Sequence, residues 1–276
     1  RKTENGAFPP LGTPESLMAL TEADIQLWQE MIFQPQNACL VMTGNFSDGM
    51  ELAAIEALSE LRNTTAQPPF TQSLPIGFCM RDEQSDLLEE VESDFASVQL
   101  AFDVDSEQVY PVAAEVLSTI TAGNDDSMLF QALREEQALV AEIESQISRV
   151  GQFSRLVIRY DVRSEWLKDT LTKVFAYLHR LTMYVRPARL NQLRTQFTTN
   201  NAMLTDDTAA LNDRLGWAWM SGDTAQADLD AAAAQYNELT AEELLDAAQT
   251  VFRPENLTIA VQYDPCLLYT SPSPRD

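Results

Sequence analysis

Histidine and cysteine, the residues most used for zinc binding and nucleophilic catalysis, are scarce in this sequence. The one histidine, His179, lies in a run of helical period, and a lone histidine near a helix end is more often a surface residue than a catalyst. The three cysteines, Cys39, Cys79 and Cys266, show neither metal-ligand spacing nor an even disulfide framework. No serine-hydrolase elbow, phosphate loop or dinucleotide fingerprint is present. The residues therefore predict no catalytic group and no metal site within the chain.

Acidic side chains gather between Arg81 and Asp94. The run lacks the Asp-x-Asp-x-Asp-Gly order of a calcium loop, so a solvated sheet edge or strand is the favoured interpretation and a cation-binding or adhesive module the weaker one. The chain has 42 acids against 18 bases and a formal net charge of −24, without a basic patch. This composition argues against a nucleic-acid partner. The sequence contains no run of 18 apolar residues, so no membrane span is predicted.

The elements that must position any site are organised by an internal repeat. Leu20-Thr21 recurs as Leu239-Thr240, and the pattern Phe-x-Pro-x-Asn occurs at 33–37 and 252–256, all at one offset of 219 residues. The threonine can cap a helix with acids in its first turn, the proline ends that helix, and the asparagine turns the chain into a β-prone run. The pattern therefore predicts helices at 21–32 and 240–250 and strands at 38–43 and 256–263. So long a period indicates tandem homologous domains.

Hydrophobic periodicity and turn residues predict the elements between the two copies. A Pro-rich stretch, 64–80, separates residues 1–63, the end of a first domain, from a second domain over 81–264. Gly123 ends one helix, and Asp126 or Ser127 is placed to cap the next through Arg134. Strands are expected at 97–102, 139–147 and 156–162, and helices at 48–62, 111–121, 164–182, 187–203, 207–220 and 224–236. This order predicts an α+β fold, a mainly antiparallel sheet with helices on one face.

One segment carries a family resemblance. Residues 123–139, with Ser127-Met128-Leu129-Phe130 and Leu133-Arg134-Glu135, resemble the Gly-rich turn and Leu-Arg-Glu helix of the insulinase-like, or pitrilysin, zinc metallopeptidases, peptidase family M16. Gly12-Thr13-Pro14-Glu15-Ser16-Leu17 and both Pro-x-Asn strands resemble the same family, so the resemblance extends to about Asp264. It implies paired homologous domains of metallohydrolase-like fold that close like a clamshell around peptides.

The resemblance also implies where catalysis belongs. One domain of the family carries an inverted His-x-x-Glu-His motif that binds zinc, whereas the corresponding helix here, 111–121, offers only Glu115. The second domain is therefore expected to be non-catalytic. Zinc is expected in the parent protein and not in this fragment, on a helix about a hundred residues before Arg1, one repeat earlier.

Arg134 is the one candidate for substrate binding. The far half of the clamshell in this family uses an arginine, and a tyrosine seven residues later, to hold the substrate backbone. Arg134 fits the first position, but the second is Ala141. This departure favours the second domain of the zinc-bearing half, and a surface ion pair with a nearby acid is the alternative role of Arg134.

The leading hypothesis is a fragment of a bacterial zinc metalloendopeptidase, a hydrolase, in which this non-catalytic domain supports the peptide chamber. The fragment alone should be inactive. Its partners would be a peptide or small-protein substrate and the other half of the clamshell, in the same chain or a paired subunit. The alternative is an inactive family member acting as a partner subunit or assembly scaffold. The compartment, bacterial periplasm or cytoplasm, stays open.

The tail, residues 265–276, resembles an in-frame translation of a sequencing adaptor. On that interpretation the tail is not native, and neither is Cys266.

Overall fold

The computed structural model describes residues 12–34, 38–59, 85–105, 108–150, 153–221 and 228–266. The chain divides into two compact units. Unit 1 takes residues 1–77 and 201–232, and unit 2 takes residues 78–200 and 233–276. The predicted linker, 64–80, and the tail beyond Cys266 lie outside the described residues, so the predicted domain boundaries stay a prediction.

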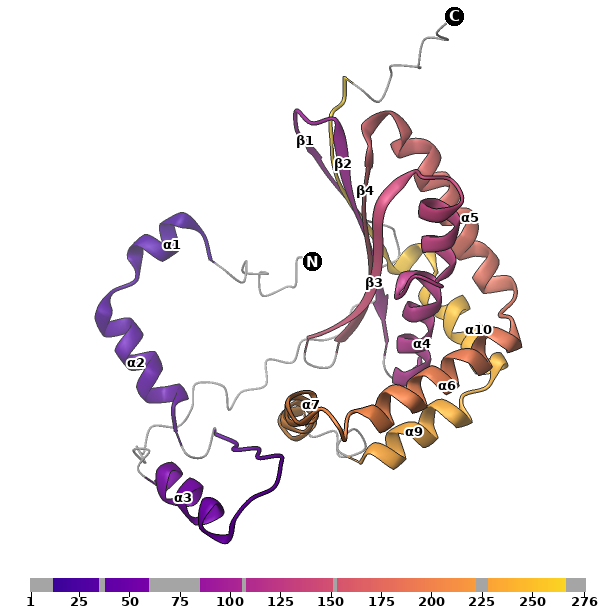
Figure 1. Ribbon diagram of the computed structural model, residues 1–276. Helices are drawn as coiled ribbons and strands as arrows, with labels where there is room; N and C mark the ends of the chain where they lie inside the picture. Colours follow the sequence, from indigo (N-terminus) through magenta and orange to yellow (C-terminus); the bar gives the residue numbers. More distant parts are fainter. Residues whose placement is uncertain are drawn as a thin grey trace, which may run out of the picture. The chain divides into compact units, whose positions relative to one another are not determined.

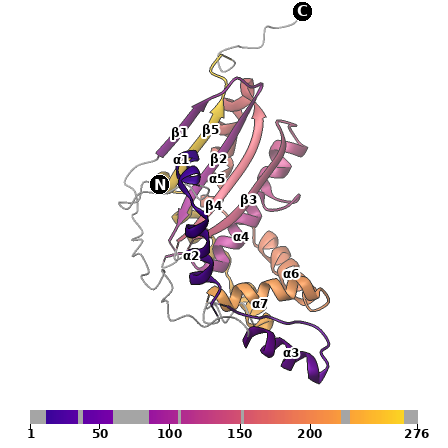
Figure 2. The same ribbon diagram turned by 90° about the vertical axis from the view of Figure 1, so that its left-hand side faces the viewer.

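Unit 1 is helical in its described part (Figures 1 and 2). Its helices are α1 (Pro14–Ala19), α2 (Glu22–Ile32), α3 (Asp48–Ser59) and α7 (Thr208–Ser221). Thr21 begins α2 with a capping box, in which its side chain accepts from the Asp24 N–H and the Asp24 carboxylate accepts from the Thr21 N–H. The predicted helices 21–32 and 207–220 are confirmed, and 48–62 is confirmed over its described residues.

The strand predicted over 38–43 is wrong, because these residues form no strand. This segment instead makes hydrogen bonds with α7. Asn212 Nδ2 donates to the Val41 carbonyl at 2.9 Å, and Thr43 Oγ1 donates to the Thr208 carbonyl at 2.7 Å. A β-strand exists only as part of a ladder with a neighbouring strand. In the described part of unit 1 no such neighbour is present, so β-propensity alone does not produce the strand.

Unit 2 is built on a five-stranded sheet (Figure 1). The strands are β1 (Ser85–Glu90), β2 (Phe95–Val104), β3 (Val140–Val150), β4 (Phe153–Arg163) and β5 (Leu257–Tyr263), in the order β1-β5-β2-β4-β3. Only the β1–β5 pair is parallel. The mainly antiparallel sheet is confirmed, and so are the predicted strands at 97–102, 139–147, 156–162 and 256–263. The acidic run 81–94 supplies β1 and the turn into β2, where β1 lies at the edge of the sheet.

The helices of unit 2 gather on one face of the sheet (Figures 1 and 2). Helix α10 packs against α4 and α5, and leucines of the helices and of the inner strands are fully buried between the two layers. Such a side chain contributes about 2 kcal/mol through burial. The helices of this layer are α4 (Pro111–Ala122), α5 (Leu167–Met183) and α10 (Ala241–Val251). Helices α6 (Pro187–Met203) and α9 (Leu229–Glu238) also belong mainly to unit 2, with residues 201–203 and 229–232 assigned to unit 1.

The second Pro-x-Asn turn joins α10 to β5. Residues Pro254–Asn256 form a 3-10 turn, and Asn256 is buried. Its Nδ2 donates to the carbonyls of Thr250, at 2.7 Å, and Val251, at 3.3 Å. These carbonyls belong to the last turn of α10 and have no partner within the helix, so the asparagine both terminates the helix and directs the chain into the sheet. The turn of the first copy, 35–37, lies outside the described residues.

Candidate functional site

Helix α4 occupies the place where the family resemblance implies zinc ligands. Among the residue types that bind zinc, α4 contains only Glu115. The Glu115 carboxylate accepts a hydrogen bond from the Tyr236 hydroxyl at 2.8 Å. The Tyr236 ring stacks on Phe197, with ring centroids 4.4 Å apart, which holds the hydroxyl in the helix layer. His179 lies exposed on α5. Within the described ranges no three His, Cys, Asp or Glu residues are grouped as metal ligands, so this part of the chain does not fit a zinc ion.

The backbone between α4 and β3 is irregular. Residues Phe130–Glu135 form a π-helix, and Ala138 adopts a positive φ of 51°. Residues 128 and 129 begin this helix before the π-helical part. The cap predicted from Ser127 is wrong, since Ser127 Oγ is buried without a hydrogen-bond partner. A π-helix next to a left-handed residue is a local strain that often marks a functional segment.

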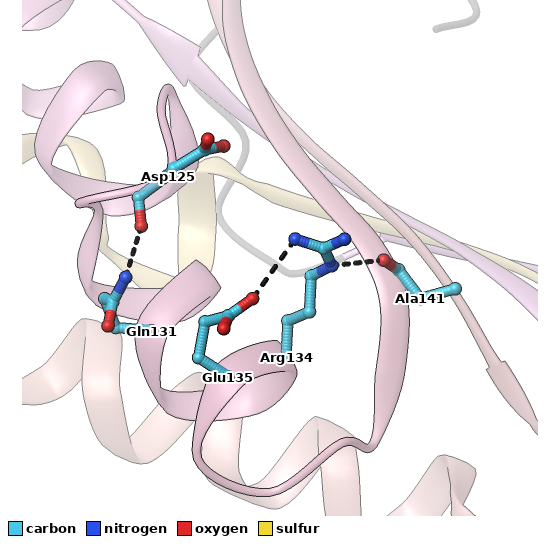
Figure 3. Close-up of polar contacts among 5 residues, drawn as sticks. All are labelled: Asp125, Gln131, Arg134, Glu135 and Ala141. Carbon is cyan, nitrogen blue, oxygen red and sulfur yellow. Dashed lines mark hydrogen bonds and ion pairs between the residues drawn. The ribbon is translucent and has the colours of Figure 1, made fainter.

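Arg134 projects from this π-helix toward β3 (Figure 3). Its Nε donates to the Ala141 carbonyl at 2.8 Å, Nη1 lies 3.1 Å from the Glu135 carboxylate, and the guanidinium sits 4.7 Å from the centre of the Phe130 ring. The side chain is 45% exposed. The position seven residues later therefore meets Arg134 through its backbone carbonyl, a contact that any residue type provides. Arg134 thus ties the irregular segment to the first residues of β3.

A β-bulge follows at the same place. Val140 pairs with Val162, and Ile143 pairs with Tyr160, so two residues of β3, Ala141 and Glu142, lie opposite the single residue of β4 between them. Ala141 and Glu142 are both exposed, and beyond them buried Ile143 and Ser145 alternate with exposed Glu144 and Gln146. Because strand side chains alternate, the bulge sets which residues of β3 face away from the helices.

The face of the sheet without helices carries a groove of about 800 Å³. Cross-strand pairing places its residues in rows: Asp161 pairs with Ser97, Ser97 with Gln262, and Gln262 with Glu89. In the next row Glu144 pairs with Arg159, which pairs with Gln99. The full lining comprises Leu87, Leu88, Glu89, Ser97, Val98, Gln99, Glu142, Glu144, Arg159, Tyr160, Asp161, Ala260, Val261 and Gln262.

Polar contacts across neighbouring strands fix these side chains. Ser97 donates to Asp161, and Gln262 Nε2 donates to the Glu89 carboxylate at 2.7 Å. The Arg159 Nε donates to Gln99 Oε1 at 3.2 Å, and its Nη1 lies 3.7 Å from Glu144. The groove surface is therefore made of ordered donors and acceptors on a rigid element, an arrangement suited to binding rather than to covalent chemistry.

Although Tyr160 is among the lining residues, its side chain belongs to the face of β4 opposite the groove, in the hydrophobic core. It is 4% exposed, and burial raises the pKa of its phenol above the ordinary value, so the hydroxyl stays neutral. The alternation predicted for this strand, with Leu156, Ile158 and Tyr160 on one face, is confirmed.

The sequence did not predict the groove. Alternation along 156–162 already separated Arg159 and Asp161 from the buried residues, and the same signal marks Glu142 and Glu144 in β3. No sequence pattern, however, reveals which strands are neighbours, and the groove exists only through the order β1-β5-β2-β4-β3. Of the residues singled out from the sequence, Arg134 lies in the segment that leads into β3, and Glu115 and His179 lie on helices.

Comparison with known proteins gives a family and a fold. The family model described as "Peptidase M16 inactive domain" matches residues 19–197. A protease from Helicobacter pylori is similar with a TM-score of 0.81 and 15% identity, over 92% of this chain and 61% of that one. A peptidase M16 inactive domain from Pseudomonas fluorescens has a TM-score of 0.72 and 19% identity, over 92% of this chain and 60% of that one.

A third similar structure is itself half of a protein. The first half of the periplasmic protease PqqL from Escherichia coli has a TM-score of 0.70 and 14% identity, over 98% of this chain and 61% of that one. The chain thus spans less than two thirds of the length of these structures. No curated protein matches the sequence significantly. In the described ranges no helix is both long and apolar enough to cross a bilayer.

Proposed function

Because this chain belongs to the peptidase M16 family and carries its inactive domain, we propose that unit 2 is a non-catalytic wall of the peptide-binding chamber of a zinc metalloendopeptidase. Zinc would be bound by a homologous domain outside this chain, since α4 offers Glu115 alone and that carboxylate is already bonded to Tyr236. Residues 1–63 would then be the end of that preceding domain, as the repeat of 219 residues indicates.

The groove on the helix-free face is the observation that carries this proposal. Strands lie about 4.8 Å apart, so five strands span roughly 19 Å, the length of about six residues of an extended peptide. The rows of amide, hydroxyl and carboxylate groups from Glu89 to Asp161 could bond to the backbone of such a peptide along this whole length. A zinc peptidase site needs grouped metal ligands, which the described ranges do not contain, whereas a wall needs only the groove.

We assign Arg134 a supporting role in the same chamber. The bond from its Nε to the Ala141 carbonyl holds the start of β3, and β3 carries Glu142 and Glu144 into the groove. The exposed edge of the guanidinium is available to a peptide carbonyl next to the groove. The ion pair with Glu135 fits the alternative role of a surface residue.

A second candidate function is that of an inactive partner subunit or assembly scaffold. Such a subunit would also contain no grouped metal ligands, as in the described ranges here. The two functions differ in one property: a chamber wall contacts peptide on the groove face, and a scaffold does not.

Photo-crosslinking distinguishes them. Benzoylphenylalanine is placed at Gln262, exposed in the groove, and in a matched variant at Thr172, exposed on α5 in the helix layer. With a labelled peptide of mixed sequence, we expect crosslinks from position 262 and not from position 172. Equal labelling at both positions, or none at either, would overturn the chamber function. Peptide cleavage by this chain with added zinc would overturn its non-catalytic assignment.

A further inference from the structure

The groove is unevenly charged. Its lining contains four carboxylates, those of Glu89, Glu142, Glu144 and Asp161, against the single guanidinium of Arg159. Arg159 is shared between Glu144 and Gln99, and Glu142 has no ion-pair partner among the described residues. The lining therefore keeps an excess of negative charge after its internal contacts are made.

The negative charge is concentrated at one end. Glu142 and Asp161 lie beside each other at the β3 bulge, with Glu144 two residues along β3. Glu89 lies at the opposite edge, three strands from Asp161 in the same row. Three strand spacings are about 14 Å, close to the distance covered by four residues of an extended chain.

We propose that this groove selects extended peptides bearing lysine or arginine, with one basic side chain at the Glu142, Glu144 and Asp161 end and a second, four residues away, at Glu89. This inference rests on the proposed function, because it names the substrate class of the same groove. Lysine and arginine suit the site because each has a long apolar stem that can lie over Leu87 and Ala260, which pair in the groove, while its head reaches a carboxylate.

General acidity of the chain is the competing explanation, since a net charge of −24 attracts any cation. A matched pair of double variants separates the two. Glu142→Gln with Glu144→Gln removes two charges from the groove, and Asp246→Asn with Glu255→Gln removes two charges from exposed positions outside it. All four side chains are exposed, so both variants are expected to fold.

The test is fluorescence anisotropy of the 276-residue chain with three labelled peptides of equal length. They alternate threonine with lysine, glutamine or glutamate, so that the alternate side chains are positive, neutral or negative. We expect the lysine peptide to bind most tightly and to weaken as salt is raised. The groove variant should lose about fivefold in affinity for the lysine peptide. The control variant should bind it like the unmodified chain.

An equal loss in both variants would overturn the inference, because charge anywhere on the chain would then suffice. Equal binding of the three peptides, with crosslinks from position 262 retained, would refute charge selection and leave the chamber function standing. Absence of both anisotropy change and crosslinks would contradict the inference and the proposed function together.

Discussion

The two copies of the repeat begin with the same local structure and end in different environments. Thr21 and Thr240 each close a capping box with the acid three residues later, Asp24 and Glu243. Helix α10 then buries Leu244, Ala247, Ala248 and Val251, whereas α2 has no buried residue. After the turn, β5 pairs on both sides in the sheet, whereas 38–43 forms no strand.

This difference separates what a segment does alone from what its neighbours supply. A helix cap is completed within four residues, so it forms in both copies. A buried helix face and a strand ladder need other elements, which only the second copy has in the described structure. Two comparisons of matched substitutions and one pH series test this separation.

The largest effect is expected in the helix cores. Leu244→Ala removes a fully buried side chain that packs in unit 2, and should lower the free energy of unfolding by about 3 kcal/mol. Its counterpart Ile25→Ala, at a side chain 56% exposed, should change it by about 0.5 kcal/mol or less. Urea denaturation followed by circular dichroism measures both. Similar losses in the two variants would mean that α2 is packed as tightly as α10.

A smaller effect is expected at the caps. Thr240→Ala removes the side chain that accepts from the Glu243 N–H at 3.1 Å, and should cost about 1 kcal/mol in the unfolding of unit 2. Thr21→Ala should leave that transition unchanged and instead increase amide hydrogen exchange in the first turn of α2. If Thr21→Ala shifted the main transition as much as Thr240→Ala, the two helices would share one cooperative unit.

The smallest expected effect is the change in stability with pH that comes from Glu243. Hydrogen bonds from the Thr240 backbone N–H and then from its hydroxyl lower the pKa of Glu243 below its ordinary value of 4.5. A depressed folded pKa contributes stability that is present above the unfolded value and lost as pH falls through the folded value. The stability advantage of the unmodified chain over Glu243→Gln should therefore shrink below about pH 4.5. Urea midpoints measured between neutral and acid pH give this difference, and an advantage independent of pH would contradict it.

Local signals in the sequence predicted much of the fold. Thr240, Pro254 and Asn256 mark the end of one element and the start of the next through bonds within a few residues, and the alternation around Ile158 gives the buried face of β4. The failures share one cause, which is dependence on distant partners. The β-prone run 38–43 had no strand to pair with, and the helix after Gly123 winds as a π-helix that ends where Arg134 reaches β3.

The candidate site was less predictable than the fold. Arg134 was visible through a family resemblance, but its contact with the Ala141 carbonyl does not depend on the side chain at that position. Glu89 and Asp161 are 72 residues apart in the sequence. They lie in one row because β5 and β2 connect their strands through the pairs Glu89–Gln262, Gln262–Ser97 and Ser97–Asp161. Strand order of this kind depends on the packing of the whole domain, so sequence periodicity could not place these residues together.

The position of β5 inside the sheet also governs the order in which unit 2 can fold during synthesis. Strand β1 is made early, yet its partner in the sheet is β5, which ends at Tyr263. Strands β2, β4 and β3 can pair as soon as residue 163 has emerged, while β1 must wait for about a hundred further residues, which at 5–20 residues per second is roughly 5–20 s. During that interval the β2 edge that β5 will cover stays open to solvent and to chaperones.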